Sequence, residues 1–257
     1  TTMLLSWNGS MFEYLMPALL MRDYKGALLE QTRRAVVRRQ IDYAHQKHVP
    51  WGISESGYYR FDAEMNYQYR GFGVPGLGRK RGLGEDLVVS PYASLIALPV
   101  DPQAVLHNID DLIKNQMLGD YGFYEAIDYT RSRLPLGQES AIVYSYMAHH
   151  QGMSLLAMAN SLEEEAIVRR FHADPHVQSV EMLLQEQAPQ QVPTDQPPGD
   201  VTGATRRAPI QVTLRDWPVP VDAPLPMAQV LSNGTYSAFV TSAGGGYSSW
   251  GEVGLTR

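Results

Sequence analysis

The chain has 257 residues, of which 44% are hydrophobic and 19% charged, and its formal net charge is −6 at pH 7. These proportions exclude a wholly disordered chain, and the acidic balance argues against a general nucleic-acid binder. The absence of cysteine excludes a disulfide scaffold, thiolate metal sites and a cysteine nucleophile. Tyrosine is in excess, with 15 residues against 6 phenylalanines, and its flat apolar face with a hydroxyl suits a sugar ring.

The first 187 residues show mainly helical patterns. Apolar residues on nearly every side of residues 11–21 predict a buried helix that is too short for a membrane span. Segment 25–48 has the period of an amphipathic helix, and segments 138–162 and 163–172 complete the predicted helices. Three further starts pair a capping residue with a proline in the first turn: Ser90-Pro91, Asp101-Pro102 and Asp174-Pro175.

The connections over residues 51–72 and 73–86 are long and rich in glycine and aromatic residues, which favours functional loops. The loop over 73–86 lacks the Gly-Lys-Ser/Thr ending of a phosphate-binding loop, so no nucleotide site is predicted there. Residues 185–209 cluster Gln, Pro, Thr and Gly, which is typical of a linker.

The last part of the chain shows β patterns, beginning at residues 210–214, and Asn233-Gly234 between two such runs predicts a hairpin. The predicted organisation is therefore a helical domain over 1–187, a linker over 188–209 and the start of a β domain over 210–257. The chain begins without a capping residue or a signal peptide. We expect it to be a fragment of a larger polypeptide.

Carboxylates carry the strongest chemical signals. Glu13 lies among apolar residues, so its side chain must be paired, protonated or facing a polar cavity. It is either a structural carboxylate held by a neighbouring Arg or Tyr, or a general acid with a raised pKa. Glu55 lies between small residues and can project into a cleft, although a solvated loop glutamate would look the same. Glu139 stands at a predicted helix start, where a favourable interaction with the helix dipole is the alternative.

Acidic residues recur beside Trp and Tyr, which indicates glycosidic chemistry, where two carboxyl groups flank the bond that breaks. His149 and His150 are adjacent in a predicted helix and are expected to point in different directions, which makes them a poor metal pair. Hydrogen bonding to sugar hydroxyls or to core residues is the favoured role. No metal or cofactor is predicted.

Four motifs together resemble the glucoamylase-like central domain of bacterial cyclic β-1,2-glucan synthases. They are Trp7-Asn-Gly-Ser-Met-Phe-Glu-Tyr-Leu-Met-Pro17, Trp51-Gly-Ile-Ser-Glu55, Tyr121-Gly-Phe-Tyr-Glu-Ala126 and His150-Gln-Gly-Met153. The run from Leu231 to Ser248 resembles the opening β-sandwich of the cellobiose-phosphorylase-like domain that follows in those proteins. The order of the two matches makes the resemblance specific.

The resemblance implies a mainly α fold, part of an (α/α)6 toroid, followed by a linker and the beginning of a β-sandwich. It implies cyclization of a β-1,2-glucan chain by retaining transglycosylation through paired carboxylates, without a cofactor. The implied partners are the glucan and the remaining domains of the same synthase, with no nucleic acid. The implied location is the cytoplasmic face of the bacterial inner membrane, although these residues contain no membrane segment.

Glu13 matches the Phe-Glu position that serves as the acid in related endo-β-1,2-glucanases, which invert. Those glucanases carry Asp-Gln-Gly-Pro where this chain has His150-Gln-Gly-Met153, and losing that carboxylate fits a change from hydrolysis to transfer. The catalytic candidates are thus Glu13, with Glu55 and Glu139 as candidates for the retaining pair. The predicted substrate-binding residues are Trp7, Asn8, Trp51, Tyr58, Tyr59, Tyr69, Arg70, Tyr121, Phe123, Glu125, His150 and Gln151. Two alternatives remain, an endo-β-1,2-glucan hydrolase and a non-catalytic glucan-binding scaffold.

Overall fold

The computed structural model describes residues 3–187, 227–251 and 253–256. The chain divides into two units, residues 1–204 and 205–257, and each is described by itself. The predicted linker over 188–209 and the first predicted strand near 210–214 lie outside the described residues, so the domain limits stay a prediction. Within the described ranges, no helix combines the length and apolar character that crossing a membrane requires.

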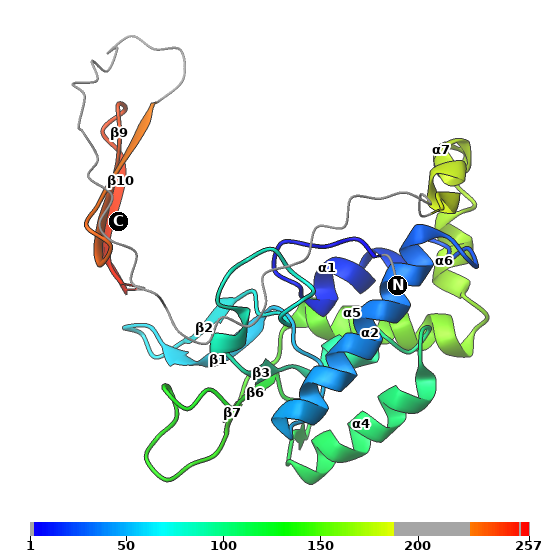
Figure 1. Ribbon diagram of the computed structural model, residues 1–257, viewed down its shortest axis with the longest axis horizontal. Helices are drawn as coiled ribbons and strands as arrows, with labels where there is room; N and C mark the ends of the chain where they lie inside the picture. Colours follow the sequence, from blue (N-terminus) through cyan, green and yellow to red (C-terminus); the bar gives the residue numbers. More distant parts are fainter. Residues whose placement is uncertain (1–2, 188–226, 252, 257) are drawn as a thin grey trace. The chain divides into compact units, whose positions relative to one another are not determined.

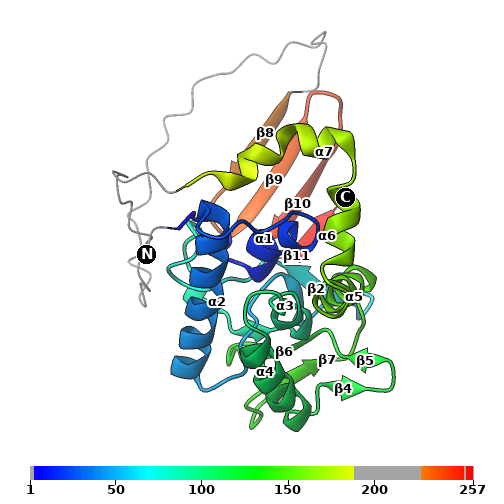
Figure 2. The same ribbon diagram turned by 90° about the vertical axis from the view of Figure 1, so that its right-hand side faces the viewer.

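The first unit is built around a group of helices. Figure 2 shows α3 in the middle of this group, and it contacts α1, α4 and α5. The helices are α1 (Met11–Leu15), α2 (Leu28–Lys47), α3 (Pro91–Leu95), α4 (Pro102–Lys114), α5 (Ala148–Leu162), α6 (Ala166–Phe171) and α7 (Pro175–Val180). Short 3-10 turns are η1 (Pro17–Leu19), η2 (Leu83–Glu85) and η3 (Glu181–Gln185).

Most predicted helix starts are confirmed, each with its physical cause. Asp101 caps α4 by accepting the N–H of Ala104 at 3.1 Å, and Asp174 caps α7 by accepting the N–H of His176 at 2.8 Å. Ser90 precedes α3 as predicted, but its hydroxyl donates to the Glu125 carbonyl at 2.5 Å instead of capping. The single helix predicted over residues 11–21 is interrupted, because Pro17 opens a separate 3-10 turn.

Small antiparallel sheets lie beside these helices (Figure 1). A hairpin joins β1 (Ser56–Phe61) and β2 (Tyr67–Arg70), and a second joins β4 (Leu118–Gly119) and β5 (Gly122–Phe123). A three-stranded sheet runs in the order β3-β6-β7, with β3 at Val88–Val89, β6 at Ala126–Asp128 and β7 at Ala141–Val143. The glycine- and aromatic-rich connection predicted as a loop over 51–72 therefore contains a hairpin.

The helix predicted over 138–162 is wrong in its first part. Residues Ala141–Val143 form strand β7, and helix α5 begins only at Ala148. The branched side chains Ile142 and Val143 suit a strand that pairs with β6 and packs beside β1. Glu139 therefore lies in an exposed bend before β7 and not at a helix start.

Buried amides hold the segment that leads into β1. Gln40 of α2 donates to the Ile53 carbonyl at 2.8 Å and accepts the Ile53 N–H at 2.9 Å. Asn108 of α4 donates to the Trp51 carbonyl at 2.7 Å and accepts the Trp51 N–H at 2.8 Å. Both amide side chains are buried. The backbone just before Glu55 is thus fixed by two different helices.

The second unit is an antiparallel sheet in the order β11-β10-β9-β8. Its strands are β8 (Ala228–Ser232), β9 (Tyr236–Thr241), β10 (Gly246–Trp250) and β11 (Val253–Thr256). The hairpin predicted at Asn233-Gly234 is confirmed between β8 and β9. The Asn233 side chain accepts the N–H of Tyr236 at 2.7 Å, and Gly234 has a φ of +92°, a conformation that glycine adopts without strain.

Candidate functional site

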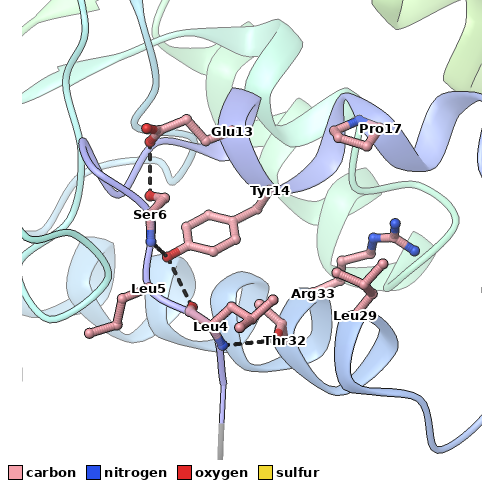
Figure 3. A pocket seen from close by; sticks show the side chains of 9 residues that line it. All are labelled: Leu4, Leu5, Ser6, Glu13, Tyr14, Pro17, Leu29, Thr32 and Arg33. Atoms are coloured by element: carbon pink, nitrogen blue, oxygen red, sulfur yellow. Dashed lines mark hydrogen bonds between the residues drawn. The ribbon is translucent and has the colours of Figure 1, made fainter. Parts of the chain in front are cut away.

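Glu13 closes the N-terminus of α1. It forms a capping box with Ser10, whose hydroxyl accepts the Glu13 N–H while the carboxylate accepts the Ser10 N–H at 3.1 Å. The carboxylate also accepts the hydroxyl of Ser6 at 2.9 Å and the N–H of Asn8 at 3.0 Å. Figure 3 shows the Glu13 side chain turned back toward Ser6, and Ser6 in turn lies beside the Tyr14 hydroxyl.

These hydrogen bonds decide the charge of Glu13. Burial by itself raises the pKa of the carboxyl, but the groups donated by Asn8, Ser10 and Ser6 outweigh it and hold the pKa below its ordinary value. Of the two alternatives left open for Glu13, a raised pKa is not found, because serines and backbone N–H groups surround the carboxylate. A mostly apolar cavity of about 200 Å³ lies beside it, lined in part by Leu4, Leu29 and Arg33 (Figure 3).

Glu55 lies one residue before β1 and is half-buried. The hydroxyl of Tyr69, on the paired strand β2, donates to Glu55 Oε1 at 2.9 Å. Burial raises the pKa of Tyr69, and the hydrogen bond to Glu55 raises it further. Tyr69 therefore keeps its proton at neutral pH and serves as a donor to the carboxylate.

Behind Tyr69 lies a buried pair. His150 Nδ1 is 3.0 Å from Glu125 Oε2, and the two residues are only 1% and 2% exposed. The other oxygen of Glu125 accepts the N–H of Gly57 at 3.0 Å. His150 Nε2 is 3.2 Å from the Tyr69 oxygen, so Glu125, His150, Tyr69 and Glu55 follow one another at hydrogen-bond distance.

His149 and His150 do not diverge as predicted. His149 Nε2 lies 3.3 Å from the Tyr69 oxygen, and the two imidazole centroids are 4.1 Å apart. Both rings reach Tyr69 because it stands beside the first turn of α5. Burial lowers the pKa of His149, and charge on His150 lowers it further. Among the described residues, no three acidic or histidine side chains are grouped as a metal site would need.

The structure does not bring Glu139 to Glu55. The N–H of Tyr59 donates to the Asp128 carboxylate, and Asp128 pairs with Ala141. Tyr59, Asp128 and Ala141 therefore lie at one level of strands β1, β6 and β7. Glu55 lies four residues before Tyr59, about 13 Å away along an extended strand at ~3.3 Å per residue. Glu139 comes two residues before Ala141 and lies on the side of this level that is away from Glu55. The separation of Glu55 and Glu139 therefore exceeds the ~5–5.5 Å between the two carboxyl groups of a retaining enzyme.

Asn8 connects the surroundings of Glu13 with those of Glu55. The pairing of Ser56 with Arg70 sets Glu55 opposite Gly71. A Cβ on Gly71 would lie 2.8 Å from the Asn8 side-chain nitrogen, so Asn8 packs directly against that position. The Asn8 N–H in turn bonds Glu13. Asn8 therefore lies between the surroundings of Glu13 and the residue opposite Glu55.

The predicted substrate-binding residues fall into three groups. Trp7, Tyr69 and Tyr121 are exposed, at 65%, 38% and 85% of their surface. The half-buried residues are Asn8, Tyr59, Arg70, Phe123 and Gln151, of which Gln151 donates to the Phe123 carbonyl at 3.2 Å. The buried residues are Trp51, Tyr58, Glu125 and His150.

The rings of Trp51 and Tyr58 are part of the hydrophobic core, so a binding role for them stays a prediction. Arg70 also has a structural partner, since it forms an ion pair with Asp86 and its guanidinium lies 5.1 Å from the centre of the Tyr58 ring. The density of aromatic residues in this segment therefore serves packing as well as any sugar contact.

Sequence reasoning missed Tyr92. Its ring stacks on His150 with centroids 3.6 Å apart and planes 10° from parallel. Its hydroxyl donates to the Glu55 carbonyl and accepts from the Ser54 hydroxyl, with both distances 2.8 Å. The helix start at Ser90-Pro91 was the available signal, because it places Tyr92 in the first turn of α3.

Two family models match separate parts of the chain. Residues 1–175 match the family described as a putative glucoamylase, and residues 217–257 match the supersandwich domain of glycosyl hydrolase family 94. The first match spans more than half of the chain. The chain therefore belongs to the putative glucoamylase family of carbohydrate-active proteins.

A curated relative is cyclic β-(1,2)-glucan synthase NdvB from Rhizobium meliloti (strain 1021). It is 42% identical over 258 residues, and the match covers 99% of this chain but only 9% of the synthase. A solved putative glucoamylase from Bacteroides uniformis ATCC 8492 is 21% identical, with a TM-score of 0.48, over 69% of this chain and 41% of that one.

Proposed function

We propose that the chain is a segment of a cyclic β-1,2-glucan synthase whose glucoamylase-like part acts on β-1,2-glucan. The similarity to the Rhizobium synthase across 99% of the chain supports this, as does the order of the two family matches. In this proposal the helices of the first unit are the later part of an (α/α)6 toroid. The remaining domains of the synthase complete the site and hold it at the cytoplasmic face of the inner membrane.

The observation that carries the chemistry is the half-buried Glu55 carboxylate, held by Tyr69 and lying across from the position against which Asn8 packs. We propose these two as the carboxylates of a retaining transglycosylation, in place of the pair of Glu55 and Glu139. The low pKa of Glu13 keeps it ionised at neutral pH, and the exposed indole of Trp7 offers a face for a glucose ring.

The reaction then runs in two displacements. One carboxyl group protonates the leaving glucosyl oxygen while the other attacks C1, which forms a glucosyl ester and releases the downstream part of the glucan. A hydroxyl at the other end of the same chain next attacks C1 and gives its proton to the first carboxyl group. The ester breaks, the ring closes and both carboxyl groups return to their starting state.

The test uses the full-length polypeptide with linear β-1,2-glucan and mass spectrometry of the products. Cyclic glucan is one water lighter than the linear chain of equal length. We expect Glu13→Gln and Glu55→Gln to abolish cyclic product, with Glu163→Gln, an exposed glutamate, as the matched control. Glu139→Gln tests the alternative pair, and loss of cyclic product there with Glu13→Gln active would reverse the assignment.

The two other candidate functions give different outcomes in the same experiment. An endo-β-1,2-glucan hydrolase produces linear oligosaccharides with inverted anomers and no cyclic material. A non-catalytic scaffold leaves cyclic product unchanged in every one of these variants.

A further inference from the structure

We propose that a row of tyrosines and the polar cavity beside it form a second binding site for the β-1,2-glucan chain, one that contains neither Glu13 nor Glu55. This inference rests on the proposed function, which supplies the glucan. The tyrosine row consists of Tyr121, Tyr124, Tyr144 and Tyr146. The cavity has a volume of about 490 Å³, within the usual range of small-molecule sites.

The rings of the tyrosine row contact one another in succession. Tyr121 and Tyr146 meet edge-on, with centroids 6.1 Å apart. Tyr124 lies between Tyr146 and Tyr144, with centroid distances of 5.5 and 4.9 Å. The outer rings, Tyr121 and Tyr144, are 85% and 62% exposed. Exposed apolar residues scattered singly need no explanation, but a contiguous group of them indicates an interaction site. A flat ring that carries a hydroxyl suits a sugar.

The backbone holds the tyrosine row in place. Figure 2 shows the β4–β5 hairpin beside the end of β7, and the Glu125 N–H donates to the Ser145 carbonyl at 2.9 Å. A Cβ on Gly119 of β4 would lie 2.5 Å from Tyr124 Cζ and 2.6 Å from the Tyr146 hydroxyl, so both rings pack on bare backbone there. The rings are thus ordered before a ligand binds, which lowers the entropic cost of binding.

The row continues into the cavity at Tyr144. Ser140, Ile142 and Tyr144 lie on one side of the edge strand β7, because successive side chains alternate, and all three line the cavity. Val143, on the other side, is buried in the core. One face of β7 therefore packs against the core, and the other forms a wall of the cavity.

The cavity is polar and nearly uncharged. Its amides and hydroxyls come from Tyr59, Asn115, Gln116, Gln138, Ser140 and Tyr144. Of the described residues that line it, Lys114 is the charged one, and its ammonium group already bonds Asp111 at 2.8 Å. Amides and hydroxyls both donate and accept, as sugar hydroxyls do. This lining fits a neutral polyhydroxylated ligand better than an ion.

The free amides argue against another domain of the synthase as the occupant. Within the described part of the chain, the side chains of Gln116 and Gln138 are exposed and have no hydrogen-bond partner. Covering them with a protein surface costs free energy for every polar group left unpaired. A glucan presents hydroxyl groups along its whole length and can pair with them.

The position of the cavity gives the second site its role. Tyr59 lines the cavity and follows Glu55 by four residues, about 13 Å along an extended strand. A glucan whose reacting linkage lies at Glu55 can therefore place a distant stretch at the second site. Holding that stretch on the protein raises the effective concentration of the chain end that closes the ring.

The test is calorimetric binding of linear β-1,2-glucan oligosaccharides of defined length to the full-length protein, with Glu55→Gln in every sample to slow turnover. Two sites for one chain make affinity rise steeply once the oligosaccharide reaches both. We expect the double change Tyr144→Ala and Tyr146→Ala to weaken binding of long chains by roughly 10-fold or more. Affinity for the shortest chains that bind should stay unchanged.

The matched control is Leu118→Ala in the same hairpin. Leu118 is 52% exposed, and alternation along β4 turns it away from the side on which Gly119 meets the tyrosines. Its loss should leave the affinity for long chains at the wild-type level. Gln138→Ala tests the cavity without altering the row and should weaken long chains alone.

Tyrosine nitration of the wild-type full-length protein needs no substitution, so it decides even where a variant unfolds. Without glucan we expect tetranitromethane to modify Tyr121 and Tyr144, and long β-1,2-glucan to protect both. Tyr43, 2% exposed, is the unreactive control. If Tyr121 and Tyr144 stay unmodified without glucan, another part of the synthase covers them and the inference fails.

Failure of the second site and failure of the proposed function give different results. Equal affinity for long chains with and without the row, or equal weakening of short and long chains, overturns the second site even if wild type makes cyclic glucan. If wild type makes no cyclic glucan while loss of the row weakens long chains alone, the proposed function fails and the second site stands.

Discussion

Glu13→Gln tests how far the capping network at α1 depends on charge. The carboxylate Oε2 accepts from the Ser6 hydroxyl at 2.9 Å and from the hydroxyl and N–H of Ser10 at 3.0 and 3.1 Å, whereas Oε1 accepts only the Asn8 N–H at 3.0 Å. A glutamine can keep its oxygen toward the serines. Its NH2 group then faces the Asn8 N–H, and two donors oppose each other.

The expected loss of stability in Glu13→Gln follows from these hydrogen bonds. One partly buried N–H loses its acceptor, which costs ~1–3 kcal/mol, and the three remaining bonds lose the strengthening that an ionised acceptor gives. We expect the free energy of local opening of α1 to fall by about 2 kcal/mol, within the range of lost N-caps. That corresponds to a loss of roughly 30-fold in the protection of its amides against hydrogen exchange.

Hydrogen exchange with mass spectrometry on the full-length protein measures this loss directly, in peptides that cover Met11–Leu15. Glu163→Gln is the control for removing one exposed glutamate. Equal protection of α1 in wild type and Glu13→Gln at neutral pH would refute the reasoning.

The difference between wild type and Glu13→Gln in the protection of α1 should also depend on pH. The pKa of Glu13 in the folded protein lies below its ordinary value of 4.5, so its stabilising contribution is complete above about pH 4.5 and is lost as pH falls through the folded pKa. At matched pH the difference in protection between wild type and Glu13→Gln should therefore shrink in acid. A difference that grows as pH falls would contradict the lowered pKa.

Three further substitutions test the packing that positions the site. Asn108→Ala removes the side chain that bonds both the N–H and the carbonyl of Trp51. It should lower the free energy of unfolding by about 2–4 kcal/mol in denaturation measurements. The control Asn115→Ala loses an exposed bond to the Asp111 carbonyl and should change the free energy of unfolding little. Gly73→Ala places a Cβ 1.7 Å from the Asn8 carbonyl oxygen, so it should displace the loop that bonds Glu13 and abolish cyclic product. Gly152→Ala meets no atom within 4 Å inside α5 and should raise stability by about 0.5–1 kcal/mol.

The features that depend on local sequence were predictable. The amphipathic period over 25–48 gave α2, and the proline-initiated starts gave α3, α4 and α7, because capping and period act within a few residues. The hairpin at Asn233-Gly234 follows from the turn chemistry alone. The family followed from four short motifs, and the match over residues 1–175 confirms it.

Features that depend on partners distant in the chain were not predictable. Residues Ala141–Val143 pair with a strand about fifteen positions earlier, and the branched residues Ile142 and Val143 alone are too short a signal to separate this strand from the helix that follows. The pKa of Glu13 depends on serines whose hydroxyls turn toward it only after folding. The link between Glu55 and Glu125 passes through Tyr69 and His150, whose sequence positions are far apart.

The buried amides of Gln40 and Asn108 have a consequence for which residues these positions accept. Each presents an N–H and a C=O side by side, as a peptide group does, so Trp51 and Ile53 each pair through both backbone groups with one amide side chain. A carboxylate of the same shape lacks the donor, and an amide with one methylene more or fewer changes the reach. Gln40→Asn and Asn108→Gln, conservative in composition, should therefore damage the protein about as much as alanine does.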